Sequence, residues 1–528
     1  MENFNRKLFV SCLVVFLLSF FARIYPVFLY SYPPGAIETV EHTIMIMHYL
    51  PKYPFIVLNY NRGIPDDPLA KTLSKELFFL QDNPPFLYLA GGSLAHLLAF
   101  FAKDIYAPFI AVSILYSLLP VALFLFLRHI TKSNAASLFG SLFLAILPAD
   151  LWYLLEGHWG SALGSLFFFL AMPLSFKYSE NPARKSLFLT IAALVLMLLT
   201  YPPFLIPYII SMAFFCALCI REKRKWISQF LKISVLCLLI SLPFLINFIS
   251  SYTSFAAAEV RQERSLSTGE AGKLADLTGL FWIFPIIGSA TLLISFAKKT
   301  KIKEAIQLLI PIAGLFLSFL LAGILLNIAY FTKIFGATLP YIIASVSAYG
   351  VYFICECSSR KNARPKLFAV PIFLLLIFLF GLFSGNSFAS FWERYKPALN
   401  EDKYGAISWV KDNTEANATV HFMGIFYEWR FFSLRNTTHV KISREGNRLD
   451  MILDYMQAVD ADYTVVYFGP GGYYEPLKNF AASLTRFGFE LVYSNKGTAI
   501  FKMKSSERPA ARKQIIENFK QRQPNIAG

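Results

Sequence analysis

Pro108–Leu127 reads PFIAVSILYSLLPVALFLFL, which is 20 positions without a charged side chain. A helix of this length rises about 30 Å, which matches the hydrocarbon core of a bilayer. Backbone polar groups in lipid must bond within their own segment, and the stretch lacks the alternation of a barrel strand, so we predict a membrane helix. Similar charge-free runs occur at Gly160–Phe176, Ile233–Ala258, Ala305–Thr332 and Leu367–Trp392. The sequence therefore predicts an α-helical polytopic membrane protein.

The composition agrees with a membrane protein and argues against a nucleic-acid partner. The 528 residues are 56% hydrophobic and only 16% charged, which is too little charge for a soluble surface of this size. The net charge of +16 resides in short loops between apolar runs, where it orients the chain in the membrane. The six cysteines fall in or beside predicted helices, so we expect neither a disulfide framework nor a zinc site.

The loop charges predict which ends of the helices face the cytoplasm. One alternate set of loops carries seventeen Lys and Arg residues and the other set carries four, so the first set is predicted to be cytoplasmic. Arg6 and Lys7 precede the first apolar run and place the N-terminus inside, as a retained signal anchor. A full crossing at Pro85–Ala102 would invert every later loop, so we interpret that segment as interfacial or re-entrant. This gives about eleven crossings, or about thirteen if that segment does cross and one further crossing is missed elsewhere. The protein is then multi-pass in the plasma membrane with its C-terminus outside.

The domain organisation follows from a change in composition after Phe391. Residues 1–392 are predicted to form the transmembrane domain, with a long first external loop at 30–103. Residues 400–504 alternate helical and strand patterns and predict a soluble extracytoplasmic α/β domain. Residues 505–528 form a polar basic tail, which we predict to be a frayed helix or disordered.

The first external loop opens with an acidic cluster, Pro33-Pro34-Gly35-Ala36-Ile37-Glu38-Thr39-Val40-Glu41-His42. If this segment is helical, Glu38 and His42 share a face and Glu41 lies beside them. A carboxylate at the membrane surface can accept a proton from a hydroxyl, or bind a divalent cation such as Mg²⁺ or Mn²⁺ at a phosphate. The alternative is an acid that only stabilises the first turn of a helix.

A second cluster, Asp150 to Gly160, lies between two apolar runs on the same predicted side. We predict that Asp150, Glu156 and His158 line the same external cavity as Glu38, and that Glu38 and Glu156 are candidate metal ligands. The aromatic residues of this turn fit a platform for a sugar ring, but they are at least as typical of an interfacial belt. Farther along, Arg261 and Arg264 offer guanidinium groups to a phosphate, although a self-paired, solvated helix explains them too.

These features together resemble the GT-C superfamily of membrane glycosyltransferases. The resemblance rests on the Pro-Gly opening followed by an acid and a histidine, on Asn83-Pro84-Pro85, on the second acidic turn, and on Gly405–Thr414. It implies that Glu38 is the first-loop catalytic acid and that Glu156 represents the second acidic motif. Asn83 stands where the aminoarabinose transferase branch often has Lys or His, and is the matching candidate for a phosphate contact. The Trp-Trp-Asp-Tyr-Gly motif of oligosaccharyltransferases is absent.

The resemblance implies inverting transfer of a sugar from a polyprenyl-phosphate donor to a protein, lipid or glycan acceptor outside the cytoplasm. Two alternatives are an oligosaccharyltransferase-like enzyme and a transporter or flippase for a lipid or sugar. Transporters place ionisable residues near the membrane midplane and contain paired, broken helices. The predicted helix interiors here are nearly free of charge, which favours the transferase.

Overall fold

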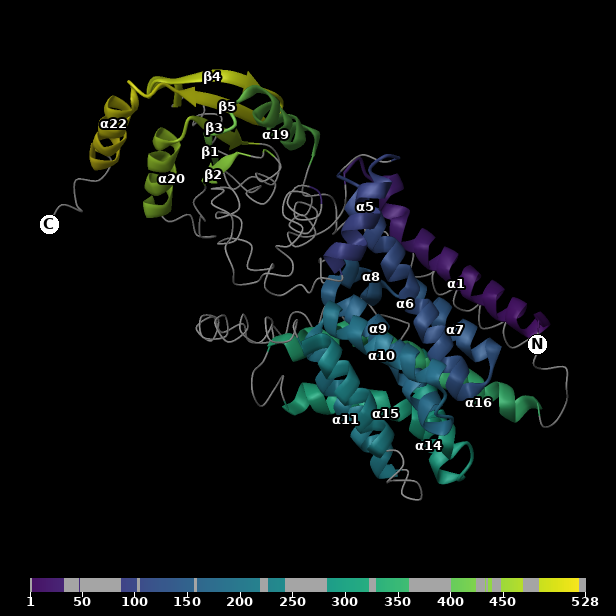
Figure 1. Cartoon of the computed structure of the whole chain (residues 1–528). Coiled ribbons are helices and arrows are strands. Elements are labelled where there is room, and N and C mark those ends of the chain that lie inside the picture. Colours follow the sequence, from purple (N-terminus) through teal and green to yellow (C-terminus); the bar gives the residue numbers. More distant parts are fainter. Residues whose placement is uncertain are drawn as a thin grey trace. The chain divides into compact units, whose positions relative to one another are not determined.

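The computed structural model describes residues 2–32, 47, 87–101, 105–155, 159–218, 227–242, 283–321, 329–359, 400–423, 433, 435–438, 448–468 and 484–521 (Figure 1). The chain divides into two compact units. The first comprises Met1–Tyr30, Pro34–Arg62 and Phe79–Lys396, and the second comprises Ser31–Pro33, Gly63–Phe78 and Pro397–Gly528.

The first unit is helical throughout its described part. Its helices are α1 (Glu2–Leu29), α5 (Gly92–Leu98), α6 (Ala107–Thr131), α7 (Asn134–Ile146), α8 (Pro148–Leu155), α9 (Trp159–Glu180), α10 (Arg184–Thr200), α11 (Leu205–Leu218), Ile227–Leu242, α14 (Ile283–Ala297), α15 (Ile302–Ser318) and α16 (Ala329–Ser359). Among the described residues, five helical segments are long and apolar enough to cross a membrane: Leu8–Leu29, Ala107–Thr131, Trp159–Glu180, Ile302–Leu321 and Ile334–Ile354.

The predicted apolar runs agree with these helices in part. Pro108–Leu127 lies within α6 and Gly160–Phe176 lies within α9, so both predictions of a helix are confirmed. Within Ala305–Thr332, the structure describes α15 and the first residues of α16, whereas residues 322–328 lie outside the described residues, so a single helix over this run stays a prediction. Leu367–Trp392 lies outside the described residues, and the total of crossings stays a prediction.

The segment predicted to be interfacial or re-entrant contains a short helical stretch. A π-helical turn, Leu87–Gly91, leads directly into α5, which ends at Leu98. The twelve described helical residues rise about 18 Å. Residues 85, 86 and 102 lie outside the described residues, so the interfacial or re-entrant placement stays a prediction.

Small residues allow close contact between α14 and α16 in the first unit. A Cβ atom added at Gly288 of α14 would lie 2.0 Å from the carbonyl oxygen of Val346 in α16. One added at Gly350 would lie 3.0 Å from the Cα of Gly288. Membrane helices gain little from the hydrophobic effect, so such close backbone approach supplies the packing contacts that hold them together.

The second unit is an α/β structure with a five-stranded sheet of order β2-β1-β3-β5-β4. Its strands are β1 (Thr419–Met423), β2 (Asn436–Thr438), β3 (Tyr463–Tyr467), β4 (Phe489–Ser494) and β5 (Thr498–Met503). β1 pairs in parallel with β2 and β3, whereas β5 pairs antiparallel with β3 and β4. The predicted hairpin around Asn495-Lys496-Gly497 is therefore confirmed, but β2 was not predicted.

Helices cover both faces of this sheet. α19 (Glu401–Asn413) is capped by Asn400, whose Oδ1 accepts from the Lys403 amide at 2.9 Å. Trp409 of α19 contacts the rings of Tyr463 and Tyr493, with centroids 6.5 and 5.6 Å away. The opposite face packs against α20 (Arg448–Asp460), where Asp454 bonds the buried His421 Nε2 of β1 at 2.8 Å.

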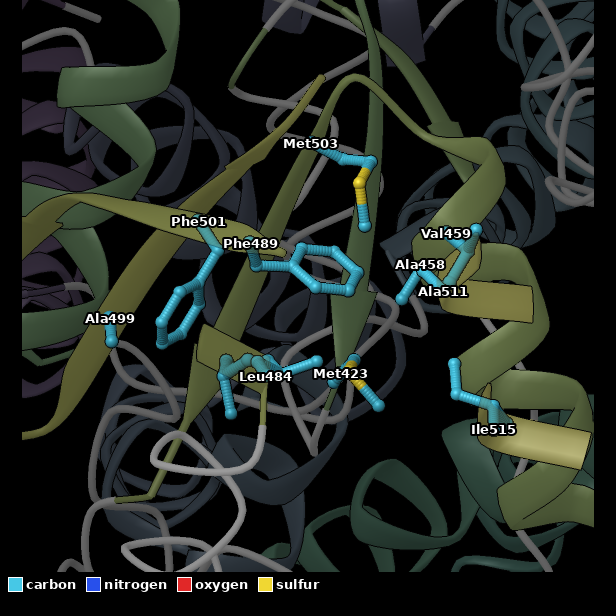
Figure 2. Close-up of a cluster of buried hydrophobic side chains, with 11 residues drawn as sticks. Met423, Ala458, Val459, Leu484, Phe489, Ala499, Phe501, Met503, Ala511 and Ile515 are labelled. Atoms are coloured by element: carbon cyan, nitrogen blue, oxygen red, sulfur yellow. The ribbon is translucent and has the colours of Figure 1, made fainter. Parts of the chain in front are cut away.

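The C-terminal tail belongs to this unit. Helix α22 (Arg508–Gln521) buries Ala511 and Ile515 in a cluster with Phe489, Phe501 and Met503 (Figure 2). The expectation of a frayed or disordered tail is wrong for this helix. Among the described side chains of the tail, Ala511 and Ile515 enter the core, and two residues one turn apart give only a weak periodic signal in a polar segment.

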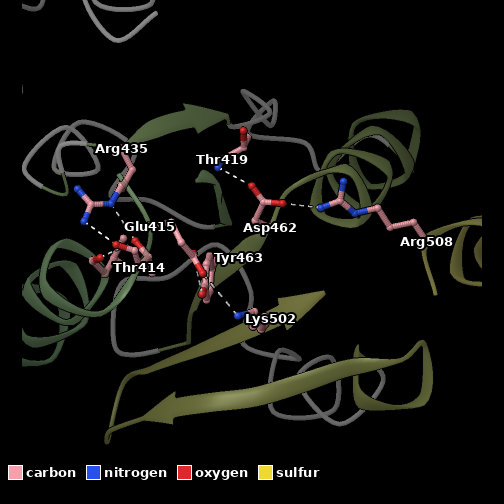
Figure 3. Close-up of polar contacts among 9 residues, drawn as sticks. Thr414, Glu415, Thr419, Arg435, Asp462, Tyr463, Lys502 and Arg508 are labelled. Atoms are coloured by element: carbon pink, nitrogen blue, oxygen red, sulfur yellow. Dashed lines mark hydrogen bonds and ion pairs between the residues drawn. The ribbon is translucent and has the colours of Figure 1, made fainter. Parts of the chain in front are cut away.

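Polar contacts link the sheet to the segments around it (Figure 3). Asp462, just before β3, accepts from the Thr419 amide at 2.9 Å and pairs with Arg508 of α22 at 2.7 Å. Tyr463 donates to Glu415 at 3.1 Å, and a hydrogen bond with Tyr463 raises the pKa of Lys502. These contacts lie at the surface, so they orient the segments more than they stabilise them.

Replacing Ile515 by alanine is expected to destabilise the second unit by about 2–5 kcal/mol, because it leaves a cavity in the core cluster. Pulse proteolysis of the full chain over a urea series measures this free energy. Ile516→Ala is the matched control, because Ile516 is 41% exposed whereas Ile515 is 1% exposed. Equal effects of the two substitutions would contradict the packing of α22.

Candidate functional site

Of the site residues predicted from the sequence, the structure describes Asp150. Glu38, Glu41, His42, Asn83, Glu156, His158, Arg261 and Arg264 lie outside the described residues. The two-acid site formed by Glu38 and Glu156 therefore stays a prediction, as does the metal site at the same residues.

Asp150 lies in the first turn of α8, directly after the break between α7 and α8. Leu147 is extended, with φ −70° and ψ 118°, and ends α7 before Pro148 begins α8. Proline suits this position because it has no amide hydrogen to satisfy and its φ is already helical. The Asp150 amide donates to the Leu147 carbonyl at 3.0 Å. The side chain of Asp150 is buried, with 3% of the residue exposed.

The partner of Asp150 is Arg23 of α1, which was not predicted as a site residue. Arg23 Nη2 forms an ion pair and hydrogen bond with Asp150 Oδ2, and Arg23 is 0% exposed. Its Nη1 donates to the Ser19 Oγ at 2.5 Å and to the Ser19 carbonyl at 3.2 Å. The available signal was a single arginine inside the apolar run Leu8–Leu29, because a charge at that depth is costly unless it is paired.

Tyrosines from two other helices lie beside this ion pair. Tyr116 of α6 and Tyr341 of α16 are completely buried and lie close enough to interact electrostatically with both charges. Tyr153 of α8 packs against α16 so closely that a Cβ at Gly336 would lie 1.8 Å from its hydroxyl oxygen. Exclusion of water strengthens the attraction between the charges and makes the loss of either partner costly.

The same region holds both ends of the Glu156–His158 segment. α8 ends at Leu155 and α9 begins at Trp159, whose Nε1 donates to the Leu154 carbonyl at 2.8 Å. Trp152 and Tyr153 contact edge to face, with ring centroids 4.8 Å apart. The ion pair and these contacts hold α8 against α1, α9 and α16. They therefore hold in place the two residues that flank the Glu156–His158 segment, Leu155 and Trp159.

This arrangement limits the chemistry that Asp150 can perform. The Asp150 carboxylate is already bonded to a buried guanidinium, so it is less available to a substrate or an acceptor hydroxyl than a carboxylate without a partner. The described residues contain no group of three His, Cys, Asp or Glu side chains that could bind a metal ion. The pair ties α8 to α1, and the carboxylates predicted to act as the base, Glu38 and Glu41, lie outside the described residues.

Comparison with solved structures identifies the fold. ArnT from Cupriavidus metallidurans bound to undecaprenyl phosphate superposes with a TM-score of 0.55 at 13% identity, and the alignment covers 96% of this chain and 99% of that one. The apo state of the same protein gives 0.56 at 14% identity with the same coverage. The chain has the ArnT fold. No protein-family model matches the sequence, and no curated protein matches it.

ArnT is an aminoarabinose transferase of GT-C type, so the resemblance seen in the sequence is confirmed at the level of the fold. The ArnT likeness extends over nearly the whole of both chains and includes both units. Together with the apolar helices, the ArnT fold makes this a membrane protein.

Proposed function

We propose that this protein is a membrane glycosyltransferase that transfers a sugar from a polyprenyl-phosphate donor to an acceptor outside the cytoplasm. The observation that carries the proposal is the likeness to a transferase bound to undecaprenyl phosphate over nearly the full length of both chains. The two acidic clusters and the apolar helices that flank them support the same function.

The reaction is an inverting displacement at the anomeric carbon of the donor. Glu38 accepts the proton of the acceptor hydroxyl, and the acceptor oxygen attacks the anomeric carbon from the side opposite the phosphate. The bond between that carbon and the phosphate oxygen breaks, and polyprenyl phosphate leaves with the electron pair. Negative charge grows on the phosphate in the transition state, so a cation placed there lowers the barrier.

The Arg23–Asp150 pair contributes to this site by position. It anchors α8 six residues before Glu156, and α8 leads straight into the acidic segment. A residue held by a packed, water-free ion pair keeps its neighbours in one place, which is what a two-acid site needs.

Transport is the less favoured alternative. Arg23 shows that the helix interiors are less free of charge than the sequence suggested. However, Arg23 is fully buried and already paired with Asp150, so it offers no site to a transported ion. The oligosaccharyltransferase alternative lacks its acceptor motif in this sequence.

The decisive experiment compares the lipids of a deletion strain with those of its parent by mass spectrometry. We expect a polyprenyl-phosphate sugar to accumulate in the deletion strain and to disappear when the full chain is restored. The purified full chain should release polyprenyl phosphate from that lipid when an acceptor extract is added. Unchanged lipids together with an inert purified protein would refute the proposed function.

Two groups can stabilise the departing phosphate, and a chelator distinguishes them. If Glu38 and Glu156 bind Mg²⁺ or Mn²⁺, EDTA should abolish transfer and added metal should restore it. If Arg261 or Arg264 binds the phosphate, EDTA should have no effect, and replacement of the responsible arginine by glutamine should slow transfer by about 10²-fold or more. Full activity in the presence of EDTA and in both arginine variants would exclude the metal ion and the arginines.

The predicted orientation is tested by cysteine labelling with a reagent that does not cross membranes. Tags at Lys223 and Ser359 should react only after the membrane is permeabilised, because Lys223 lies in one loop of the basic set and Ser359, the last residue of α16, directly precedes another. Tags at Thr268 and Lys478 should react in intact cells. External labelling at Lys223 would place the acidic clusters on the cytoplasmic side and overturn the orientation.

A further inference from the structure

An open apolar groove lies between α10 and the helix Ile227–Leu242, away from the Arg23–Asp150 pair. Its volume is about 650 Å³, within the range of roughly 300–1,000 Å³ that is typical of ligand sites. The lining residues are Leu187 of α10 with Ile227, Ser228, Leu231, Lys232, Val235 and Leu236. The lining residues of the helix Ile227–Leu242 lie in two adjacent rows, and the residues of each row are four positions apart. One face of this helix therefore borders the groove.

The groove lies at one end of both helices. Leu187 is in the first turn of α10, which begins at Arg184, and the lining residues of the other helix start at its first residue, Ile227. Arg184 precedes Leu187 by three positions, so it lies on the same face of α10, one turn closer to the helix end. A chain-like apolar ligand in the groove would therefore have basic side chains at its headgroup end.

Lys232 has no counter-charge in this groove. It is exposed, and the other lining residues apart from Ser228 are apolar. In the described part of the chain, no carboxylate pairs with Lys232 or with Arg184. The acid at the end of α9, Glu180, pairs instead with Lys303 at 3.2 Å. An ammonium group that faces lipid is costly unless it reaches water or an anion.

We propose that this groove binds one anionic phospholipid. An acyl chain would lie along Leu231, Val235 and Leu236, and the phosphate would accept hydrogen bonds from the Lys232 ammonium group. Arg184 would bind the same headgroup from α10. Basic pockets between membrane helices recognise anionic headgroups in this way, by charge combined with an apolar channel for the chain.

A bilayer phospholipid fits this position better than the polyprenyl-phosphate donor does. The loop charges predict that this end of the helices faces the cytoplasm and that both acidic clusters face outward. On that topology, a donor phosphate bound here would lie on the opposite side of the membrane from Glu38. The groove is therefore a lipid site separate from the proposed reaction, and its test does not depend on glycosyl transfer.

Native mass spectrometry of the purified full chain tests the proposal with three added lipids, namely phosphatidylglycerol, phosphatidylcholine and polyprenyl phosphate. Phosphatidylglycerol should be retained, and phosphatidylcholine should bind about fivefold more weakly or not at all, because it carries no net negative charge. Lys232→Gln should weaken phosphatidylglycerol binding by about fivefold. The matched control is Lys298→Gln, which removes an exposed lysine outside the groove and should bind as the parent does.

A second variant tests the apolar channel with the charges intact. Val235→Trp fills the groove, so phosphatidylglycerol binding should fall although Lys232 and Arg184 remain. Parental binding by both Lys232→Gln and Val235→Trp would overturn the proposal. Equal retention of phosphatidylcholine would also overturn it, as would retention of polyprenyl phosphate in place of phosphatidylglycerol.

Discussion

Replacing Glu38 by glutamine should lower sugar transfer by about 10²–10⁴-fold, because a positioned general base contributes a factor of that size. Glutamine keeps the size and hydrogen-bonding ability of the side chain but cannot accept the proton of the acceptor. The variant should insert and fold as the parent protein does. Initial rates of polyprenyl phosphate release from the purified full chain, at saturating donor, measure the loss.

Glu41→Gln is the matched control for this prediction and should lose less activity. Glu38 is favoured because it is predicted to share a helix face with His42 and matches the first-loop acid of the GT-C pattern. Parental activity in Glu38→Gln with loss in Glu41→Gln would assign the base to Glu41. Parental activity in both variants would make the first loop structural and remove the main support for the proposed mechanism.

Replacing Asp150 by alanine should destabilise the first unit by about 3–5 kcal/mol, because it leaves the Arg23 guanidinium buried without its counter-charge. Arg23 is 0% exposed and Asp150 is 3% exposed, so the guanidinium left behind is shielded from water. Unfolding of the full chain in mixed micelles of increasing denaturing detergent, followed by circular dichroism, measures the change.

Two controls separate the buried pair from charge effects in general. Lys303→Ala removes one partner of an ion pair with side chains 75% and 41% exposed, and should cost less than about 1 kcal/mol. Arg23→Met combined with Asp150→Leu removes both charges, and should recover most of the stability that Asp150→Ala loses. Equal effects of Asp150→Ala and Lys303→Ala would contradict a desolvated pair.

The double variant also tests the positioning role of the pair. If the pair anchors α8 for catalysis, the double variant should transfer sugar at close to the parental rate, because apolar packing replaces the anchor. If Asp150 binds substrate directly, as the sequence analysis predicted, the double variant should stay inactive although it is stable. The two roles therefore give opposite activities at similar stability.

Local features of the sequence determined the membrane class and most of the elements. A helix must be about 20 apolar residues long to cross a bilayer, so composition alone predicts membrane helices at Pro108–Leu127 and Gly160–Phe176. The strands at Thr419–Met423 and Tyr463–Tyr467 and the hairpin at Asn495-Lys496-Gly497 follow from short-range patterns in the same way. The likeness to the GT-C fold also rests on short motifs that are readable in order along the chain.

Only the tertiary structure determined which distant residues meet. Arg23 and Asp150 are 127 positions apart, and neither the isolated arginine in α1 nor the acid in α8 indicates its partner. Ile515 joins the core of the second unit, and β2 extends its sheet, through contacts with elements far along the chain. The physical reason is that the cost of burying a charge, or the gain from burying a single isoleucine, depends on what surrounds the side chain after folding, and that environment is assembled from several helices and strands.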